Sequence, residues 1–201
     1  MYLTVVNKIY LMTTPQTRIL KIPIIDANSE NIKPYGHLLG DDVSKPGLGI
    51  PFYQGRVIEG ENIDFLYRGT ATFRTAKIMP GYPSINWLER HMHMTQLFIG
   101  LGQAPFIMVM APPNHTQGEN LPDLNQVKAL RFPPGHALLL HIGTWHDFPI
   151  ACDQAVVILT ANSDEVVTAL SQMKEPDEMN QGDVYKISLP KRLRYEIQLD
   201  I

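Results

Sequence analysis

The sequence predicts a single domain of mainly β structure, built as a β-sandwich or a β-barrel. From residue 50 onward the chain consists of short apolar runs rich in β-branched and aromatic residues, and Gly, Pro and Asn separate these runs. No long amphipathic helix separates consecutive runs, which disfavours a parallel α/β sheet. A chain of 201 residues is also long enough to bury one sizeable core.

The expected elements follow this pattern along the chain. A helix cap at 26–30 is expected to precede a short helix over 32–35. One short helix or turn is expected within 121–132, where apolar residues recur at helical spacing. The polar segment 112–120 is expected to be a surface loop. Strands are expected at 63–68, 70–78, 85–100, 105–111, 136–142 and 154–161.

Composition and charge narrow the class of protein. With 44% hydrophobic and 18% charged residues, a net charge of −3 and a pI near 6.1, the chain resembles an ordinary soluble protein and offers no surface for nucleic acid. The single cysteine, Cys152, excludes an intramolecular disulfide and suits the cytoplasm. The first eleven residues are neither a convincing signal peptide nor a membrane span, and Met12 is a candidate for the true start.

The most informative feature is a pair of histidine motifs about fifty residues apart. His91 and His93 are separated by one residue, so on a single strand both imidazoles would face the same side. His146 closes the second motif, which also contains His141 and Gly143. A histidine from a second strand could complete a cluster that binds one metal ion or one substrate.

The two motifs resemble those of the cupin superfamily, and their flanks resemble the ureidoglycolate lyase family of cupins. The resemblance implies an all-β cupin barrel, a double-stranded β-helix with a few short helices. It also implies a homodimer that splits (S)-ureidoglycolate into glyoxylate and urea. The likeness rests on Leu88-Glu89-Arg90-His91, Thr95-Gln96, Phe98, His141, Gly143-Thr144-Trp145-His146, Pro34-Tyr35-Gly36, Gln54-Gly55 and Phe73-Arg74.

The chain departs from the family pattern beside these motifs. Met92 stands where Pro is usual, and Asp147 replaces a frequent His. Leu140 and Ile142 replace a Tyr and an Arg, so the pocket lacks a polar pair. The likeness nevertheless spans most of residues 20–165, and we expect these residues to form the barrel. Residues 1–19 would then be an N-terminal extension, and residues 166–201 would pack on the barrel or serve as a dimer arm.

The chemistry of the expected substrate suggests roles for the candidate residues. Ureidoglycolate is a hemiaminal, so its cleavage needs a base for the hydroxyl proton and an acid for the departing nitrogen. Histidine does either near neutral pH, and a divalent transition metal (nickel, zinc, manganese or iron) could bind the carboxylate and hydroxyl together. The candidates are His91, His141, His146 and Gln96 for catalysis; Arg74, Arg90, Thr95 and Trp145 for binding a small carboxylated substrate; and His91, His93 and His146 for the metal.

Two other functions fit the same motifs. A cupin enzyme such as an isomerase or a dioxygenase could use a three-histidine metal centre on another small oxo or hydroxy acid. A binding or sensor cupin could keep the pocket and lack turnover. Nothing in the sequence predicts a nucleic-acid or membrane partner.

Overall fold

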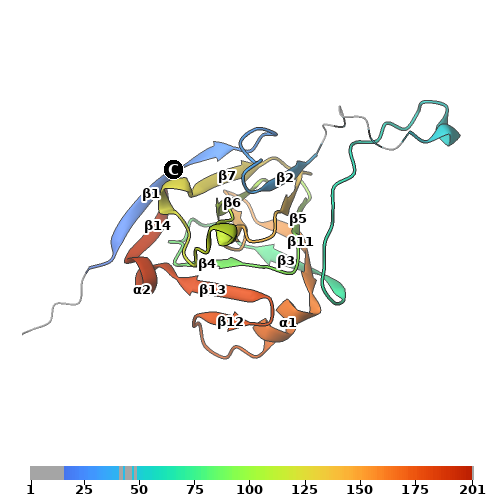
Figure 1. Cartoon of the computed structure of the whole chain (residues 1–201). Coiled ribbons are helices and arrows are strands. Elements are labelled where there is room, and N and C mark those ends of the chain that lie inside the picture. Colours follow the sequence, from blue (N-terminus) through green and yellow to red (C-terminus); the bar gives the residue numbers. More distant parts are fainter. Residues whose placement is uncertain (1–15, 41–42, 44–46, 48, 201) are drawn as a thin grey trace, which may run out of the picture.

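Two curled β-sheets form a half-barrel in the computed structural model, which describes residues 16–40, 43, 47 and 49–200 (Figure 1). The predicted mainly β fold is therefore confirmed. The larger sheet has the order β12 (Met179–Gln181), β13 (Val184–Ser188), β4 (Trp87–Arg90), β9 (Trp145–His146), β6 (Phe106–Ala111), β7 (Lys128–Phe132), β1 (Arg18–Asp26) and β14 (Tyr195–Asp200), and β10 (Ile150–Ala151) also pairs with β6. The smaller sheet has the order β2 (Gly36–Leu39), β8 (Ala137–Leu140), β5 (Gln96–Leu101), β11 (Val156–Ser163) and β3 (Ala71–Ile78).

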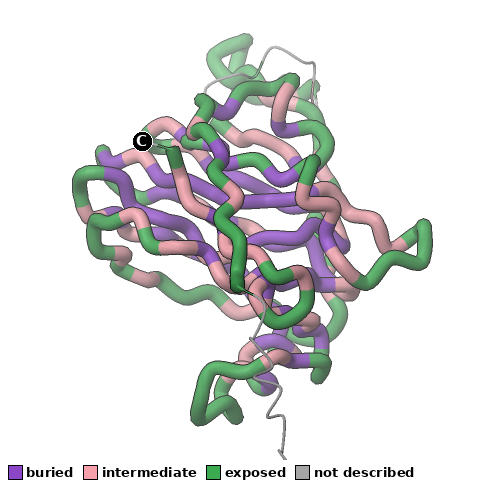
Figure 2. The backbone as a smooth tube through the Cα atoms, turned by 90° about the vertical axis from the view of Figure 1, so that its left-hand side faces the viewer, coloured by how far each residue is buried: buried purple, intermediate pink, exposed green. Residues whose placement is uncertain are grey.

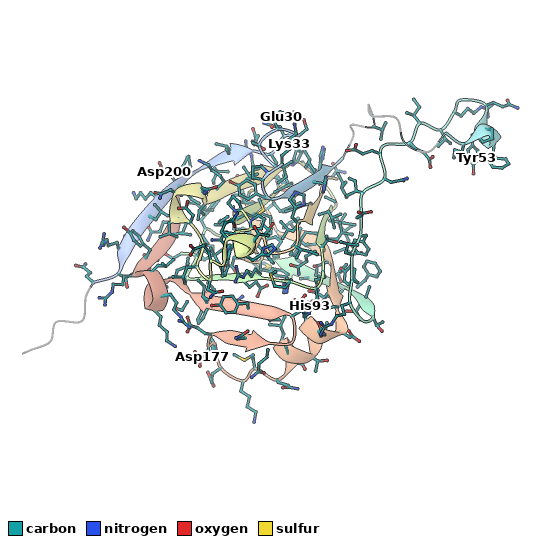
Figure 3. The ribbon with its side chains drawn as sticks, in the orientation of Figure 1. Glu30, Lys33, Tyr53, His93, Asp177 and Asp200 are labelled. Atoms are coloured by element: carbon teal, nitrogen blue, oxygen red, sulfur yellow. The ribbon has the colours of Figure 1, made fainter. Side chains whose placement is uncertain are left out.

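Helical structure is confined to short pieces. The α-helices are α1 (Asp164–Ser171) and α2 (Leu189–Leu193), and single 3-10 turns form η1 (Pro51–Tyr53), η2 (His115–Gln117) and η3 (Leu124–Gln126). Within the described residues, none of these helices has the length and apolar character needed to cross a membrane. Figure 1 shows that the segment carrying η1 extends away from the sheets, and Tyr53 lies on it in Figure 3.

Strand β6 is buried on both faces, which explains its continuous apolar sequence. Its side chains alternate between two cores: Met108 and Met110 pack with Phe98 in the space between the sheets, and Val109 packs with Trp145 on the opposite face. Figure 2 shows this burial concentrated in the central strands. The core between the sheets is the one that adjoins the histidines.

The inner face of β11 changes from apolar to polar along the strand. Val156 and Ile158 belong to the core between the sheets, and Thr160 and Asn162 follow on the same face by the strand period. Both polar residues are fully buried. One end of the barrel interior is therefore polar, and this end receives the histidine motifs.

The segment 166–201 is part of the barrel wall. Strand β13 pairs antiparallel with β4, and β14 pairs with the first six residues of β1 in parallel register. Because β1 begins at Arg18, the last residues of the expected N-terminal extension belong to the fold. The candidate start at Met12 lies outside the described residues.

The expected strand over 85–100 is wrong as a single element. Strand β4 ends at Arg90, residues 91–95 form a bend, and β5 begins at Gln96. This break changes which side chains face the interior, and the site depends on it.

Two other expectations also need correction. Residues 63–68 form no strand, and 32–35 form a turn, because Pro34 disfavours helical backbone at the residue before it. The short helix or turn expected within 121–132 is confirmed by η3, and β7, which pairs with β6, follows it. The strands expected at 70–78, 105–111, 136–142 and 154–161 are confirmed by β3, β6, β8 and β11, with shifted ends.

Candidate functional site

Glu89, His91 and His146 meet on the inner side of the larger sheet, where β4 pairs with β9. Glu89 and His146 are direct partners in this pairing. Glu89 Oε1 lies 3.9 Å from His91 Nε2 and 3.7 Å from His146 Nε2, and the two imidazole centroids are 5.4 Å apart. All three side chains are buried. The expected convergence of His91 and His146 is thus present in the structure, with a carboxylate between them.

Backbone carbonyl groups fix the orientation of both imidazoles. His91 Nδ1 contacts the carbonyl oxygen of Asp183, and His146 Nδ1 lies 3.0 Å from that of Thr144. A carbonyl oxygen only accepts hydrogen bonds, so each Nδ1 carries a proton, which leaves Nε2 as the ring nitrogen available to a metal or a substrate. Neither Nε2 has a hydrogen-bond partner among the described residues. Both Nε2 atoms therefore face the same carboxylate.

Electrostatics set the charges of this group. Burial raises the pKa of Glu89, but Lys186, His91 and His146 together outweigh burial and lower that pKa to about 2. The Lys186 ammonium lies 3.0 Å from Glu89 Oε2. Burial lowers the pKa of His146 to about 4. At neutral pH the site consequently contains a carboxylate and a neutral imidazole.

These residues fit a divalent transition metal. The three donor atoms all lie within 4.8 Å of one another, and two histidines with one carboxylate are a common ligand set for zinc and iron. The two unpartnered Nε2 atoms carry the lone pairs that such a metal requires. Glu89 stands in this group at the place that the sequence analysis gave to His93.

His93 lies in a second group, outside the first. Its Nδ1 is 2.9 Å from Glu165 Oε2, and its Nε2 is 3.3 Å from a guanidinium nitrogen of Arg68. Arg68 also binds the other oxygen of Glu165 at 2.6 Å. Figure 3 shows His93 beside the end of the sheet that carries α1. The Arg68 guanidinium balances the charge of the Glu165 carboxylate, so these two residues form an ion pair to which His93 is hydrogen-bonded.

Gln96 faces the interior because the chain bends between β4 and β5. Its neighbour on the same face of β5, Phe98, places its ring 6.0 Å from that of His146. The Gln96 amide donates to Asn162 Oδ1 at 3.0 Å. Gln96 Oε1, Asn162 Nδ2 and Thr160 Oγ1 are buried and have no partner among the described residues. These atoms add hydrogen-bonding capacity to the polar end of the barrel.

Arg74 lies on β3 opposite Thr160 of β11. Residues directly opposite in an antiparallel pair share a face, so Arg74 is on the inner face of the smaller sheet. Its side chain is exposed, and the guanidinium has no hydrogen-bond or ion-pair partner in the described part of the chain. The position suits the expected contact with a substrate carboxylate.

Arg90 and Trp145 form the opposite face of the same strands. The Arg90 guanidinium stacks over Trp145 at 4.4 Å and over Tyr185 at 5.0 Å, and it donates to the Glu119 carbonyl at 2.9 Å. Trp145 donates to Asn114 Oδ1 at 2.9 Å. The two side chains thus hold the loop after β6, and these contacts give no support to the expected role in substrate binding.

His141 and Thr95 line a surface cleft of about 490 Å³, together with His37 and Leu66. His141 Nε2 lies 3.1 Å from the Lys33 carbonyl oxygen, and Thr95 Oγ1 accepts from the Leu66 amide at 2.9 Å. Neither residue belongs to the group of Glu89, His91 and His146. Gly143 joins the two motifs, because its amide donates to the His91 carbonyl at 2.7 Å.

Lys186 and Asp183 were not predicted to belong to the site, although Lys186 contacts Glu89 and Asp183 contacts His91. Both come from β13 or the turn before it, far along the chain from the histidine motifs. The proximity of Glu89 to His91 was indicated by the sequence, since the strand period places residues two apart on the same face.

The chain matches a known protein family over most of its length. A family model described as ureidoglycolate lyase matches residues 21–183, which includes every member of the Glu89, His91 and His146 group. A search of curated proteins found no match.

Proposed function

Because the chain belongs to the ureidoglycolate lyase family, we propose that Glu89, His91 and His146 are the residues that perform its reaction. The family activity is the cleavage of a carbon–nitrogen bond in ureidoglycolate, which yields glyoxylate and urea. The observation that carries this assignment is the convergence of two buried Nε2 atoms, each without a partner among the described residues, on one carboxylate.

The reaction is an elimination that moves one proton. The substrate hydroxyl loses its proton, the carbonyl of glyoxylate forms, the carbon–nitrogen bond breaks, and the nitrogen takes a proton to give urea. A single imidazole can accept the hydroxyl proton and return it to the nitrogen. His91 Nε2 suits this step, because the Asp183 carbonyl holds the proton of the ring on Nδ1.

The exposed Arg74 and the buried Gln96 and Asn162 are assigned to binding and orienting the substrate. We assign the substrate carboxylate to Arg74, whose guanidinium can bind it through two parallel hydrogen bonds. Gln96 and Asn162 offer one free acceptor and one free donor, which match the amide and carbonyl groups of the ureido end. Burial of the site excludes bulk water and strengthens these polar contacts.

We propose a divalent transition metal as the cofactor, held by Glu89, His91 and His146. Bound there, it would act as a Lewis acid toward the hydroxyl and carboxylate of the substrate. The two histidine lone pairs would then serve as ligands, and His141 is the remaining candidate to carry the proton. Metal content therefore separates the two forms of the mechanism.

We propose that the protein works as a cytoplasmic homodimer. Several apolar side chains outside the cores are exposed, including Phe52 at 80%, Ile58 at 72% and Phe73 at 62%. Contact with a second copy of the chain would remove exposed apolar side chains of this kind from water. Sedimentation equilibrium would test this proposal, and a monomer at micromolar concentration would contradict it.

The first test is an assay of glyoxylate and urea on racemic ureidoglycolate, with metal measured in the same sample. We expect both products in equal amounts, well above spontaneous decay. Loss of activity on chelation and its return with one metal would support the metal-bound form. Unchanged activity in metal-free protein would support the proton transfer by His91. Binding of ureidoglycolate without turnover would instead indicate a non-catalytic protein.

A further inference from the structure

The turn between β12 and β13 reaches across the barrel wall to the first histidine motif. It contains Gly182 and Asp183, and Asp183 is only 4% exposed. Gly182 has a φ of +54°, and a Cβ atom there would come within 2.9 Å of the Glu165 carbonyl oxygen. Glycine therefore lets this turn pack closely against α1.

Asp183 makes three hydrogen bonds with the bend that follows β4. Its backbone carbonyl accepts from His91 Nδ1. Its side-chain Oδ1 accepts from the amide of Met92 at 2.6 Å and from the amide of His93 at 2.9 Å. One buried residue thus binds three consecutive positions of the histidine motif.

These contacts terminate β4 and orient the His91 ring. The amides of Met92 and His93 are bound to the carboxylate and so are not used in a strand ladder, which lets the chain bend after Arg90. Two charge-assisted hydrogen bonds fix the backbone of the bend, and this backbone determines where the His91 ring lies. The carbonyl contact then selects the tautomer with its lone pair on Nε2.

We propose that Asp183 is a positioning residue that sets the orientation and tautomer of His91. For the effect on turnover, this inference rests on the proposed function of His91. The effect on the ring itself does not depend on any activity, so the two can be measured separately.

The test compares Asp183→Ala and Asp183→Asn with the control Asp177→Ala, an exposed aspartate of the same C-terminal segment with a side chain that is 73% exposed. Long-range ¹H–¹⁵N correlation spectra of protein with ¹⁵N-labelled histidine report the tautomer, and His91→Asn identifies the His91 signals. We expect the Nδ1–H form in the unaltered protein and in the control. Asp183→Ala should add the Nε2–H form or exchange broadening.

Turnover should change in the same variants that alter the His91 signals. We expect kcat to fall about 10- to 100-fold in Asp183→Ala with a smaller change in KM, the usual range for a residue that orients a metal-binding or catalytic histidine. Asp183→Asn should recover most of the activity, because its amide oxygen can accept the same two hydrogen bonds.

A folded Asp183→Ala protein with unchanged His91 signals and unchanged kcat would overturn the proposal. If Asp183→Ala does not fold, Asp183→Ser serves in its place, since its hydroxyl can accept one of the two bonds and should give intermediate changes. Unaltered signals and kcat in that variant would overturn the proposal equally. If the unaltered protein lacks lyase activity, the proposed function fails while the tautomer measurement still decides the role of Asp183.

Discussion

Glu89 binds the Lys186 ammonium through Oε2 at 3.0 Å, and its Oε1 lies 3.7 Å from Nε2 of His146. One carboxylate therefore connects β13, near the C-terminus, with His91, which follows β4, and with His146 of β9. Burial of a carboxylate is costly unless a cation compensates it. Lys186 supplies that cation and keeps Glu89 charged.

Replacing Lys186 by methionine should destabilise the protein and impair the site. The variant keeps the length of the side chain but leaves the Glu89 carboxylate buried without its cation, which costs roughly 3 kcal/mol. The pKa of Glu89 should rise, because Lys186 is the strongest influence that lowers it. Urea denaturation and the pH profile of kcat/KM measure the two effects. Lys191→Met, at a lysine with a 63% exposed side chain, is the control and should change stability by less than about 0.5 kcal/mol.

Replacing Gly143 by alanine should disturb the second histidine motif. Gly143 has a φ of +81°, and an added Cβ would overlap the ring of His115. Gly135→Ala is the control for backbone strain alone, because Gly135 has a φ of +74° and no atom within 4 Å of the added Cβ. We expect Gly135→Ala to cost about 1 kcal/mol and Gly143→Ala about 2 to 3 kcal/mol. Equal losses in thermal denaturation would contradict the overlap with His115.

Replacing Arg74 by glutamine should raise KM with little effect on folding. The guanidinium lies on the inner face of β3 and is free to bind a carboxylate, and loss of such a contact costs about 10- to 100-fold in affinity. Lys77→Gln is the matched control, because Lys77 is exposed on the outer face of the same strand. Steady-state kinetics of both variants test this role. An equal KM for Arg74→Gln and Lys77→Gln would remove Arg74 from the site.

Replacing Glu178 by glutamine should flatten the loss of stability in acid. The pKa of Glu178 is lowered to about 2, and hydrogen bonding to Arg192 is the largest cause. A carboxylate with a lowered pKa stabilises the fold above its ordinary pKa of 4.5, and that contribution disappears as the pH falls toward 2. The free energy of unfolding between pH 5 and pH 2 should thus fall less steeply in Glu178→Gln than in the exposed control Glu175→Gln. Parallel curves for the two variants would argue against the effect.

The sequence predicted the fold class and two of the three residues in the central group. Short apolar runs with Gly and Pro between them predicted a mainly β fold, either a sandwich or a barrel, and the two histidine motifs predicted that His91 and His146 converge. Both inferences depend on local periodicity and on the general geometry of paired strands.

The placement of His93 and Gln96 could not be predicted in the same way. The strand period assigns both faces correctly only if the strand continues, and no glycine or proline marks a break between 91 and 95. The bend depends on the Asp183 carboxylate, which takes the amides of Met92 and His93. A contact between residues about ninety positions apart leaves no local pattern. Lys186 was missed for the same reason.

The most direct test of the central claim is the formation of glyoxylate and urea by His146→Ala, compared with His136→Ala in an exterior turn. Both products should fall together by at least about 100-fold in His146→Ala, since its Nε2 faces Glu89, and His136→Ala should keep full activity. Circular dichroism would verify that both variants are folded. Full lyase activity in a folded His146→Ala protein would contradict the assignment of Glu89, His91 and His146 as the reactive group.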